Sequence, residues 1–255
     1  MDRRTFLTAA LAGGAAVGLV TPGDQAAAQT VQTSAKIVII GAGAAGMALA
    51  NRLVRRLDGA QITMIDPRPN HLYQPGLTLV AAGLKPASYV ISDNTDWLPN
   101  GVSFVADKVS AVDAISKTVS TEGGQTLDYD WLVVAPGLVL DHDAIDGFSL
   151  DIVGENGIGA LYAGPEYAAK TWTAANRFTE EGGTGIFTRP ATEMKCAGAP
   201  LKHTFLIDDI ARRAGNAGKV NMVYAAPQGS LFGVPIVAEK VRMLFEDRGV
   251  ETMMN

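Results

Sequence analysis

The sequence predicts an α/β protein in which parallel β-sheets alternate with helices. Short continuous apolar runs are bounded by glycine or proline, which is typical of strands buried on both faces of a parallel sheet. Segments with near-helical spacing of apolar residues separate these runs, as in chains built from βαβ units. The 255 residues exceed the roughly 100 to 200 of a usual domain, so we expect two modest domains or one large one.

Residues 1–30 are predicted to be a signal segment. Arg3 and Arg4 precede Phe6-Leu7, a weakly apolar run extends to Val20, and residues 26–28 (AAA) offer a cleavage site of small residues. The paired arginines resemble a twin-arginine signal, which carries folded proteins to the periplasm. An ordinary secretory signal with two chance arginines is the alternative. A membrane anchor is less favoured, because a spanning helix needs about 20 apolar residues.

The first βαβ unit is predicted within residues 35–65. Residues 35–40 (AKIVII) and 61–65 (QITMI) are expected to be strands, and residues 44–57 between them a helix. A Pro- and Gly-rich stretch follows at residues 67–86. Its aromatic and apolar content indicates that it lines a site rather than forming a plain linker.

The rest of the first domain, which we place at residues 31–150, is predicted to be largely β-structure. The expected features are strands at 102–105 and 117–120, a turn at 123–124, and a buried-type strand at 131–135 that ends at Pro136-Gly137.

A second, incomplete Rossmann-like domain is expected at residues 151–255. Its predicted elements are a strand at 184–188, a helix at 201–213, a strand at 219–225 and a helix at 237–248. The sequence ends shortly after this helix, so we expect the last unit to lack its closing strand. Residues 189–192 (RPAT) follow the first strand where a nicotinamide-binding domain would carry GxGxxG.

Composition excludes several classes of site. The formal net charge of −5 gives no basic field, so we expect no nucleic-acid partner. The single cysteine, Cys196, cannot form an intramolecular disulfide or a multi-cysteine cluster, and the three histidines are scattered along the sequence. We therefore expect no metal site.

A glycine fingerprint follows the first strand and predicts a dinucleotide site. Gly41 permits a tight turn, Gly43 lets backbone N–H groups approach a diphosphate, and Gly46 lets the helix pack against the strand. Asp66 ends the second strand and is placed to accept hydrogen bonds from ribose hydroxyls. FAD is favoured over NAD because a second small-residue turn, at residues 135–137, ends a strand further along the chain.

Four further segments are distinctive: HLYQPGLTLVAAGL at 71–84, WLVVAPGL at 131–138, KCAGAPLKH at 195–203 and LFGV at 231–234. Through them the chain resembles the sulfide:quinone oxidoreductase family, within the FAD-dependent pyridine nucleotide-disulfide oxidoreductase superfamily. The resemblance implies a Rossmann-like FAD-binding domain and a flavin-dependent oxidoreductase. It also implies sulfide or a related small sulfur compound as substrate, quinone as electron acceptor, and peripheral membrane association.

The resemblance also assigns roles to particular residues. Ala44, Ala45 and Asp66 are expected at the adenosine diphosphate portion, Gln74 nearer the isoalloxazine, and the Val109 backbone beside the adenine. The turn that contains Pro136 and Gly137 is expected to close over the flavin.

Cys196 matches the first of the two redox cysteines of that family. Lys195 and Lys202 lie nearby, and a helix is expected to begin near Leu201; cations and a helix N-terminus both favour a reactive thiolate. The alternative is a buried, inert cysteine. The family's second cysteine is absent, so the chain is expected to be truncated and could be inactive.

Two other functions stay open. One is the flavoprotein subunit of a flavocytochrome c sulfide dehydrogenase, which passes electrons to a haem partner. That family tethers its flavin through a cysteine, which residues 71–76 (HLYQPG) lack. The other is a non-catalytic flavin-binding remnant. Among the weaker candidates, His203 is expected to be a surface or capping residue, and Tyr73 and Trp97 to be packing residues.

Overall fold

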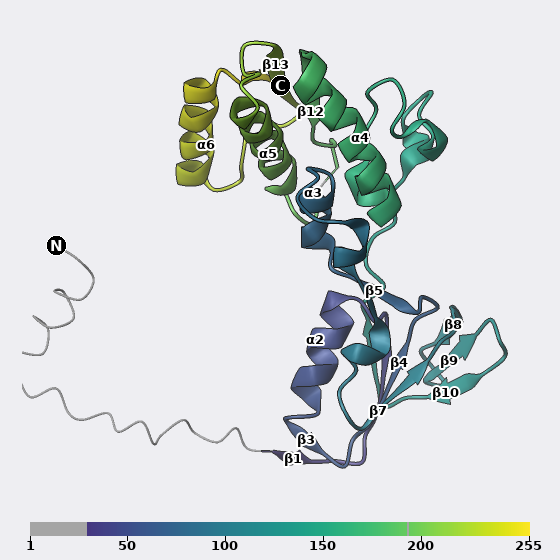
Figure 1. Cartoon of the computed structure of the whole chain (residues 1–255). Helices are drawn as coiled ribbons and strands as arrows, with labels where there is room; N and C mark the ends of the chain where they lie inside the picture. Colours follow the sequence, from purple (N-terminus) through teal and green to yellow (C-terminus); the bar gives the residue numbers. More distant parts are fainter. Residues whose placement is uncertain (1–29, 193) are drawn as a thin grey trace, which may run out of the picture.

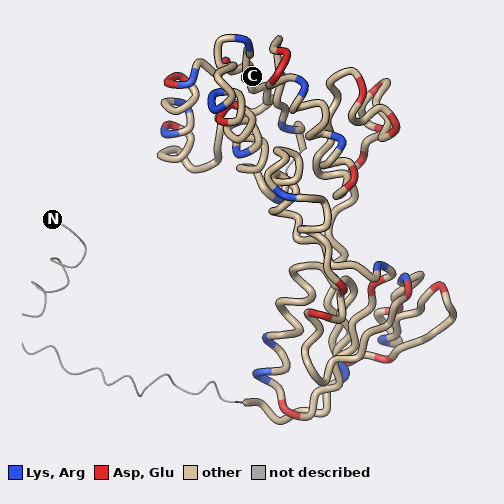
Figure 2. The backbone as a smooth tube through the Cα atoms, viewed as in Figure 1, with Lys and Arg blue, Asp and Glu red and all other residues tan. Residues whose placement is uncertain are grey.

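The computed structural model describes residues 30–192 and 194–255, which form two lobes (Figure 1). The lower lobe in the view of Figure 1 contains α2 (Ala44–Leu53) and most of the strands before residue 140. The other lobe contains α4 (Pro165–Glu181), α5 (Ala199–Arg213) and α6 (Pro235–Arg248). Lysines and arginines are interspersed with acidic residues in both lobes (Figure 2).

The first lobe is built on a four-stranded parallel sheet with the order β11-β2-β4-β7. Its strands are β2 (Lys36–Ile40), β4 (Gln61–Ile65), β7 (Val102–Val105) and β11 (Trp131–Val134). One face of the sheet packs against α2, with Ile39, Met64 and Ala50 fully buried between them. The predicted βαβ unit is therefore confirmed, and it places the glycine turn at the carboxyl edge of the sheet.

An antiparallel three-stranded sheet packs against the opposite face through Val38, Ile65, Val119 and Tyr129. It consists of β8 (Val109–Asp113), β9 (Thr118–Thr121) and β10 (Thr126–Asp128). The predicted turn at residues 123–124 is present, since the Gly124 amide donates to the Thr121 carbonyl at 3.0 Å.

Strand β11 differs from the prediction that it is buried on both faces. It lies at the edge of its sheet, where it pairs with β2, and Trp131 and Val134 are 68% and 67% exposed. The prediction was wrong because an apolar run shows that a strand can be buried but not which neighbours it has.

The second lobe contains a parallel sheet with the order β12-β13-β14. Its strands are β12 (Gly183–Thr188), β13 (Val220–Ala226) and β14 (Glu251–Met254). Tyr224, Phe245 and Ile207 form the centre of its core. The expectation that the last unit lacks a closing strand is wrong, because β14 pairs in parallel with β13. The four residues of β14 (ETMM) begin with polar side chains and contain no apolar run that would predict a strand.

The helix predicted at residues 44–57 ends earlier, at Leu53, because Leu57 and Asp58 pair with an N-terminal strand instead. The remaining strands and the short helix are β1 (Val31–Gln32), β3 (Leu57–Asp58), β5 (Asn70–Leu72), β6 (Ile91–Asp93) and α3 (Leu77–Val80). The 3-10 turns are η1 (Gln74–Gly76), η2 (Ala87–Val90), η3 (Asn94–Asp96), η4 (His142–Ala144), η5 (Leu150–Ile152) and η6 (Leu161–Ala163).

Residues 77–90 extend from the first lobe into the second, and the chain then returns to the first lobe, where β7 pairs with β4. Leu77, Val80, Ala81 and Val90 form a buried cluster with Ala168 of α4. The Pro- and Gly-rich stretch therefore carries the chain out of the first lobe and anchors it in the second. Within the described part of the chain, no helix combines the length and apolar character that crossing a bilayer requires.

Candidate functional site

The turn between β2 and α2 requires glycine at two positions. Gly41 has φ +105°, and a Cβ there would lie 2.2 Å from the Ala135 carbonyl oxygen at the end of β11. A Cβ on Gly46 would lie 1.9 Å from the Gly41 carbonyl oxygen. Gly41 thus permits the tight approach of two strand ends, and Gly46 permits the helix to pack on the turn.

Gly43 behaves differently, because a Cβ added there would meet nothing within 4 Å. It is the N-cap of α2, and no side chain caps this end of the helix. The first-turn N–H groups of a helix have no partner within the helix and carry its positive dipole end. Ala44 and Ala45 are exposed there. The turn is therefore an open cradle that fits a diphosphate.

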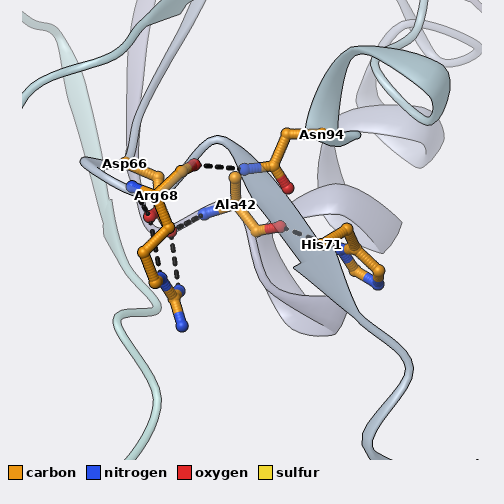
Figure 3. A network of polar contacts seen from close by, with 5 residues as sticks. All are labelled: Ala42, Asp66, Arg68, His71 and Asn94. Atoms are coloured by element: carbon orange, nitrogen blue, oxygen red, sulfur yellow. Dashed lines mark hydrogen bonds and ion pairs between the residues drawn. The ribbon is translucent and has the colours of Figure 1, made fainter. Parts of the chain in front are cut away.

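Asp66 lies beside this turn, directly after β4, and is almost fully buried. Its carboxylate accepts hydrogen bonds from the Ala42 amide at 2.8 Å and the Arg68 amide at 2.9 Å (Figure 3). The Arg68 guanidinium donates two more, at 3.0 and 2.8 Å. Burial alone would raise the pKa of Asp66, but the hydrogen bonds from Arg68 and the two amides outweigh it and lower that pKa.

Arg68 thus stands where ribose hydroxyls were expected to bind Asp66. Both carboxylate oxygens already accept hydrogen bonds, so a ribose contact with Asp66 would displace the half-exposed guanidinium. The surrounding loop is held by Asn94, whose amide donates to the Arg68 carbonyl at 2.6 Å. His71 Nδ1 lies 3.3 Å from the Ala42 carbonyl oxygen and ties β5 to the glycine turn (Figure 3).

The turn after β11 reaches the same edge of the sheet. The Ala135 amide donates to the Ile40 carbonyl at 2.8 Å, and the Cβ position of Gly41 lies 3.1 Å from the Pro136 Cα. Gly137 follows with φ +85° and open space around it. Val109, at the start of β8, packs partly buried against the cluster that contains Ile65. Its predicted backbone contact with adenine stays a prediction.

A second group of predicted residues gathers in front of α5. Lys195 Nζ donates a hydrogen bond to Gln74 Oε1, although the two residues are 121 positions apart. Lys195 Nζ also lies 5.7 Å from the centre of the Tyr162 ring. Cys196 is exposed and in no disulfide, so the part of the alternative that has this cysteine buried is wrong. Its carbonyl accepts a hydrogen bond from Ala199, the first residue of α5.

Tyr162 was not identified from the sequence. Burial first, and then the charge of the neighbouring Cys196, raise the pKa of Tyr162 to about 12. Burial lowers the pKa of Lys195, and the charge of Cys196 works in the opposite direction. Tyr162 carries no motif that would have revealed it, whereas Lys195 stands within the KCAGAP segment.

His203 differs from expectation. His203 is buried, not at the surface; its Nε2 lies 3.1 Å from the Ala81 carbonyl oxygen, and burial lowers its pKa. Tyr73 and Trp97 are each about half exposed and line a cavity of 380 Å³ together with His71 and Tyr89. Among residues 30–192 and 194–255, no three His, Cys, Asp or Glu side chains group as metal ligands would.

Comparisons with known proteins identify relatives of this chain. The chain is 31% identical over 225 residues to the mitochondrial sulfide:quinone oxidoreductase of Mus musculus, and the matched region covers 87% of this chain and 48% of the relative. It is 32% identical over 229 residues to the mitochondrial enzyme of Dictyostelium discoideum, covering 89% of this chain and 50% of the relative. The chain thus spans about half the length of these curated relatives.

The solved sulfide:quinone oxidoreductase of Aquifex aeolicus shares the fold, with a TM-score of 0.70 at 22% identity, covering 87% of this chain and 51% of that one. A family model described as pyridine nucleotide-disulphide oxidoreductase matches residues 35–180, which include the glycine turn, Asp66 and the turn after β11. The chain therefore belongs to the pyridine nucleotide-disulphide oxidoreductase family and has its Rossmann-like FAD-binding domain.

Proposed function

We propose that the chain takes part in FAD-dependent oxidation of sulfide, or of a related small sulfur compound, with electrons passing to quinone. The observation that carries this proposal is the exposed Cys196 of the KCAGAP segment, next to Lys195, which contacts Gln74 and lies near the Tyr162 ring. The two curated relatives are named as sulfide:quinone oxidoreductases, which supports sulfide and quinone as the reactants.

The residues at the sheet edge fit FAD. The first N–H groups of α2, in the open space at Gly43, would bind the diphosphate. The close approach of Gly41 to Pro136 would bound one side of this site. Asp66 would accept hydrogen bonds from the ribose hydroxyls once the Arg68 guanidinium no longer donates to its carboxylate. When bound, FAD supplies a two-electron acceptor for sulfur oxidation and passes the electrons to quinone.

Cys196 would carry the sulfur atom. Hydrosulfide attacks the Cys196 sulfur of a mixed disulfide, a new S–S bond forms, and the old S–S bond breaks with its electron pair leaving on the other thiolate. Cys196 is then a persulfide, which hands its outer sulfur to an acceptor nucleophile and is released as a thiolate. The mixed disulfide re-forms from this thiolate and the departed thiol with the loss of two electrons, for which FAD would be the acceptor. Because the sequence contains one cysteine, the departing thiol comes from outside these 255 residues.

Electron and proton counts balance over the whole reaction. Oxidation of H₂S to the level of elemental sulfur releases two electrons and two protons, which reduce one quinone to its quinol. The exposure of Cys196 suits this role, because the sulfur donor and the sulfur acceptor must both reach it from solvent.

The experiment that tests this function is quinone reduction by purified, FAD-loaded protein. We expect sulfide to drive the loss of the absorbance of a short-chain ubiquinone analogue, and NADH to drive none. Turnover with NADH in place of sulfide would contradict the proposal, as would sulfide oxidation that reduces a c-type cytochrome but no quinone. The second outcome would favour a haem partner.

We also propose that the protein is exported to the periplasm and associates peripherally with the membrane. The arginine pair Arg3-Arg4, which lies outside the described residues, supports export by the twin-arginine route. Fractionation of cells that produce the parent and the Arg3→Lys/Arg4→Lys variant tests this. The parent should appear in the periplasmic or membrane fraction and the variant in the cytoplasm. An identical distribution would exclude the twin-arginine route.

A further inference from the structure

Four aromatic rings surround a cavity of 380 Å³ beside β5 and β6. They belong to His71, Tyr73, Tyr89 and Trp97, and the two tyrosines and the tryptophan are 52%, 45% and 54% exposed. Soluble proteins rarely leave a contiguous apolar surface open to water unless it binds something. Three large rings that share one cavity and stay about half exposed are therefore candidates for contact with a ligand.

The surrounding structure holds these rings in place. Strands β5 and β6 pair antiparallel, with His71 opposite Ser92. Trp97 Nε1 donates to Ser92 Oγ at 2.7 Å, and the Trp97 ring lies 6.3 Å from the ring of His71. The rings of Tyr73 and Tyr89 meet edge to face at 6.2 Å. The aromatic surface is thus formed before a ligand arrives, which spares binding the entropic cost of ordering it.

The lining indicates a flat ligand without charge. Besides the four rings, the cavity is lined by Val90, Ile91 and Ser92, so these seven described residues include no Asp, Glu, Lys or Arg. A charged ligand would lose hydration here without gaining an oppositely charged partner. A planar ring can instead stack on the exposed faces of Trp97 and Tyr73.

The polar groups of the cavity suit a ligand that accepts hydrogen bonds. The Ser92 hydroxyl accepts from Trp97, and its own O–H is not used in that bond, so it is available as a donor. Tyr73 and Tyr89 bring the other two hydroxyl groups of the lining. An aromatic lining with a few polar groups is the usual composition of a small-molecule site. A quinone head group matches it, because it is a planar, uncharged ring whose carbonyl oxygens accept hydrogen bonds at its edge.

The cavity lies next to the proposed flavin site. His71 Nδ1 lies 3.3 Å from the carbonyl oxygen of Ala42 in the glycine turn. Tyr73 directly precedes Gln74, which is expected nearer the isoalloxazine. A second cavity, of 730 Å³, shares His71 and Trp97 with the first and continues along α2. It gives room for a chain attached to a ring in the first cavity.

We propose that the cavity bounded by His71, Tyr73, Tyr89 and Trp97 binds an uncharged planar ring that carries carbonyl oxygens at its edge. This rests on the proposed function, in which such a ring is the quinone that accepts the electrons. The ring stacks on Trp97, and Ser92 donates a hydrogen bond to one carbonyl oxygen. Aromatic residues that the sequence predicted only to pack thus recognise the electron acceptor.

Calorimetric titration of the full chain with a short-chain ubiquinone analogue tests this, because it measures binding without sulfide or turnover. Trp97→Ala should raise the dissociation constant about tenfold, since the stacking surface is lost. Ser92→Ala should raise it several-fold through the loss of one neutral hydrogen bond. Trp131→Ala is the matched control. Trp131 is 68% exposed on β11 and outside the lining, so its replacement should leave the dissociation constant unchanged.

A second ligand separates recognition of the carbonyl oxygens from simple apolar contact. An alkylbenzene with the same side chain keeps the ring but lacks these oxygens. It should bind the parent more weakly than the quinone does, and it should bind Ser92→Ala and the parent equally. Thermal unfolding checks that each variant is folded. Ser92→Ala removes a single oxygen atom, so it decides the question if Trp97→Ala does not fold.

Parent-like quinone affinity in either Trp97→Ala or Ser92→Ala, or an equal loss in Trp131→Ala, would overturn the proposal. Equal binding of the quinone and the alkylbenzene to the parent would also overturn it. Quinone binding that passes these tests in a protein that sulfide does not turn over would refute the proposed function alone. Sulfide-driven quinone reduction with an unchanged KM for quinone in Trp97→Ala would refute this site and leave the proposed function standing.

Discussion

Replacing Gly43 by valine should separate flavin binding from folding. The Gly43 backbone has φ −74° and ψ −174°, which valine adopts readily, and a Cβ there meets no atom within 4 Å. The remaining cost is a poorer N-cap, about 1 kcal/mol. This is small against the roughly 5–15 kcal/mol that hold a typical protein folded. The variant should therefore fold.

The same side chain would occupy the space in front of the first N–H groups of α2. Each hydrogen bond lost between those groups and a charged phosphate is worth about 1.5–3 kcal/mol. Loss of one or two should weaken FAD binding at least about tenfold, or ~1.4 kcal/mol. The assays are titration of flavin-free protein with FAD by calorimetry and thermal unfolding without flavin.

Gly41→Ala is the informative comparison. The backbone at Gly41 has φ +105°, and the added Cβ would lie 2.2 Å from the Ala135 carbonyl oxygen. The substitution should therefore lower the free energy of unfolding, by about 1–3 kcal/mol from backbone strain alone. Gly43→Val should thus lose flavin but keep its unfolding temperature, whereas Gly41→Ala should lower that temperature. Parent-like FAD affinity in Gly43→Val would show that the diphosphate does not lie at this turn.

Three further predictions concern charged residues. Asp208→Ala should destabilise the second lobe by about 1–3 kcal/mol, because the buried carboxylate accepts from Arg212 at 2.9 Å and Arg248 at 2.5 Å. Thermal unfolding measures this, and Asp209→Ala, which removes only the half-exposed pair with Arg213, should differ little from the parent. The lowered folded-state pKa of Asp66 stabilises the protein above the ordinary carboxyl value of about 3.9, and this contribution is lost as pH falls through the folded pKa. Urea unfolding of the parent and Asp66→Asn should therefore show a gap in stability at pH 6 that narrows towards pH 3; a constant gap would contradict the pairing seen with Arg68. Arg68→Met should strengthen ADP binding several-fold in calorimetry, since the guanidinium no longer competes for Asp66, and weaker binding would show that Arg68 assists the nucleotide.

The sequence predicted the dinucleotide-binding lobe well because its signals are local. The fingerprint at residues 41–46 is dictated by contacts within one turn, and the structure gives Gly41, Gly43 and Gly46 the three different environments expected of them. The strands at 36–40 and 61–65 are apolar because both of their faces are covered. For such residues, local pattern and tertiary environment carry the same information.

Other features depend on neighbours that no local pattern reveals. The edge position of Trp131 and the pairing of β14 are set by strand order. Gln74 meets Lys195, 121 positions away, because residues 77–90 directly after it pack into the second lobe. Arg68 follows two positions after Asp66, and that spacing could have suggested a pair between them.

The central claim is that Cys196 receives sulfur in a protein that binds FAD, and a single-turnover measurement tests it most directly. FAD-loaded parent, with Cys196 first converted to a mixed disulfide by a small thiol, and FAD-loaded Cys196→Ser are mixed with sulfide in the absence of quinone, and the visible flavin absorbance is followed in time. Because Cys196 is exposed, the substitution should leave FAD content and unfolding temperature unchanged. The parent flavin should bleach and the variant flavin should stay oxidised, since a serine hydroxyl cannot hold a persulfide. Equal bleaching in the two proteins would contradict the account.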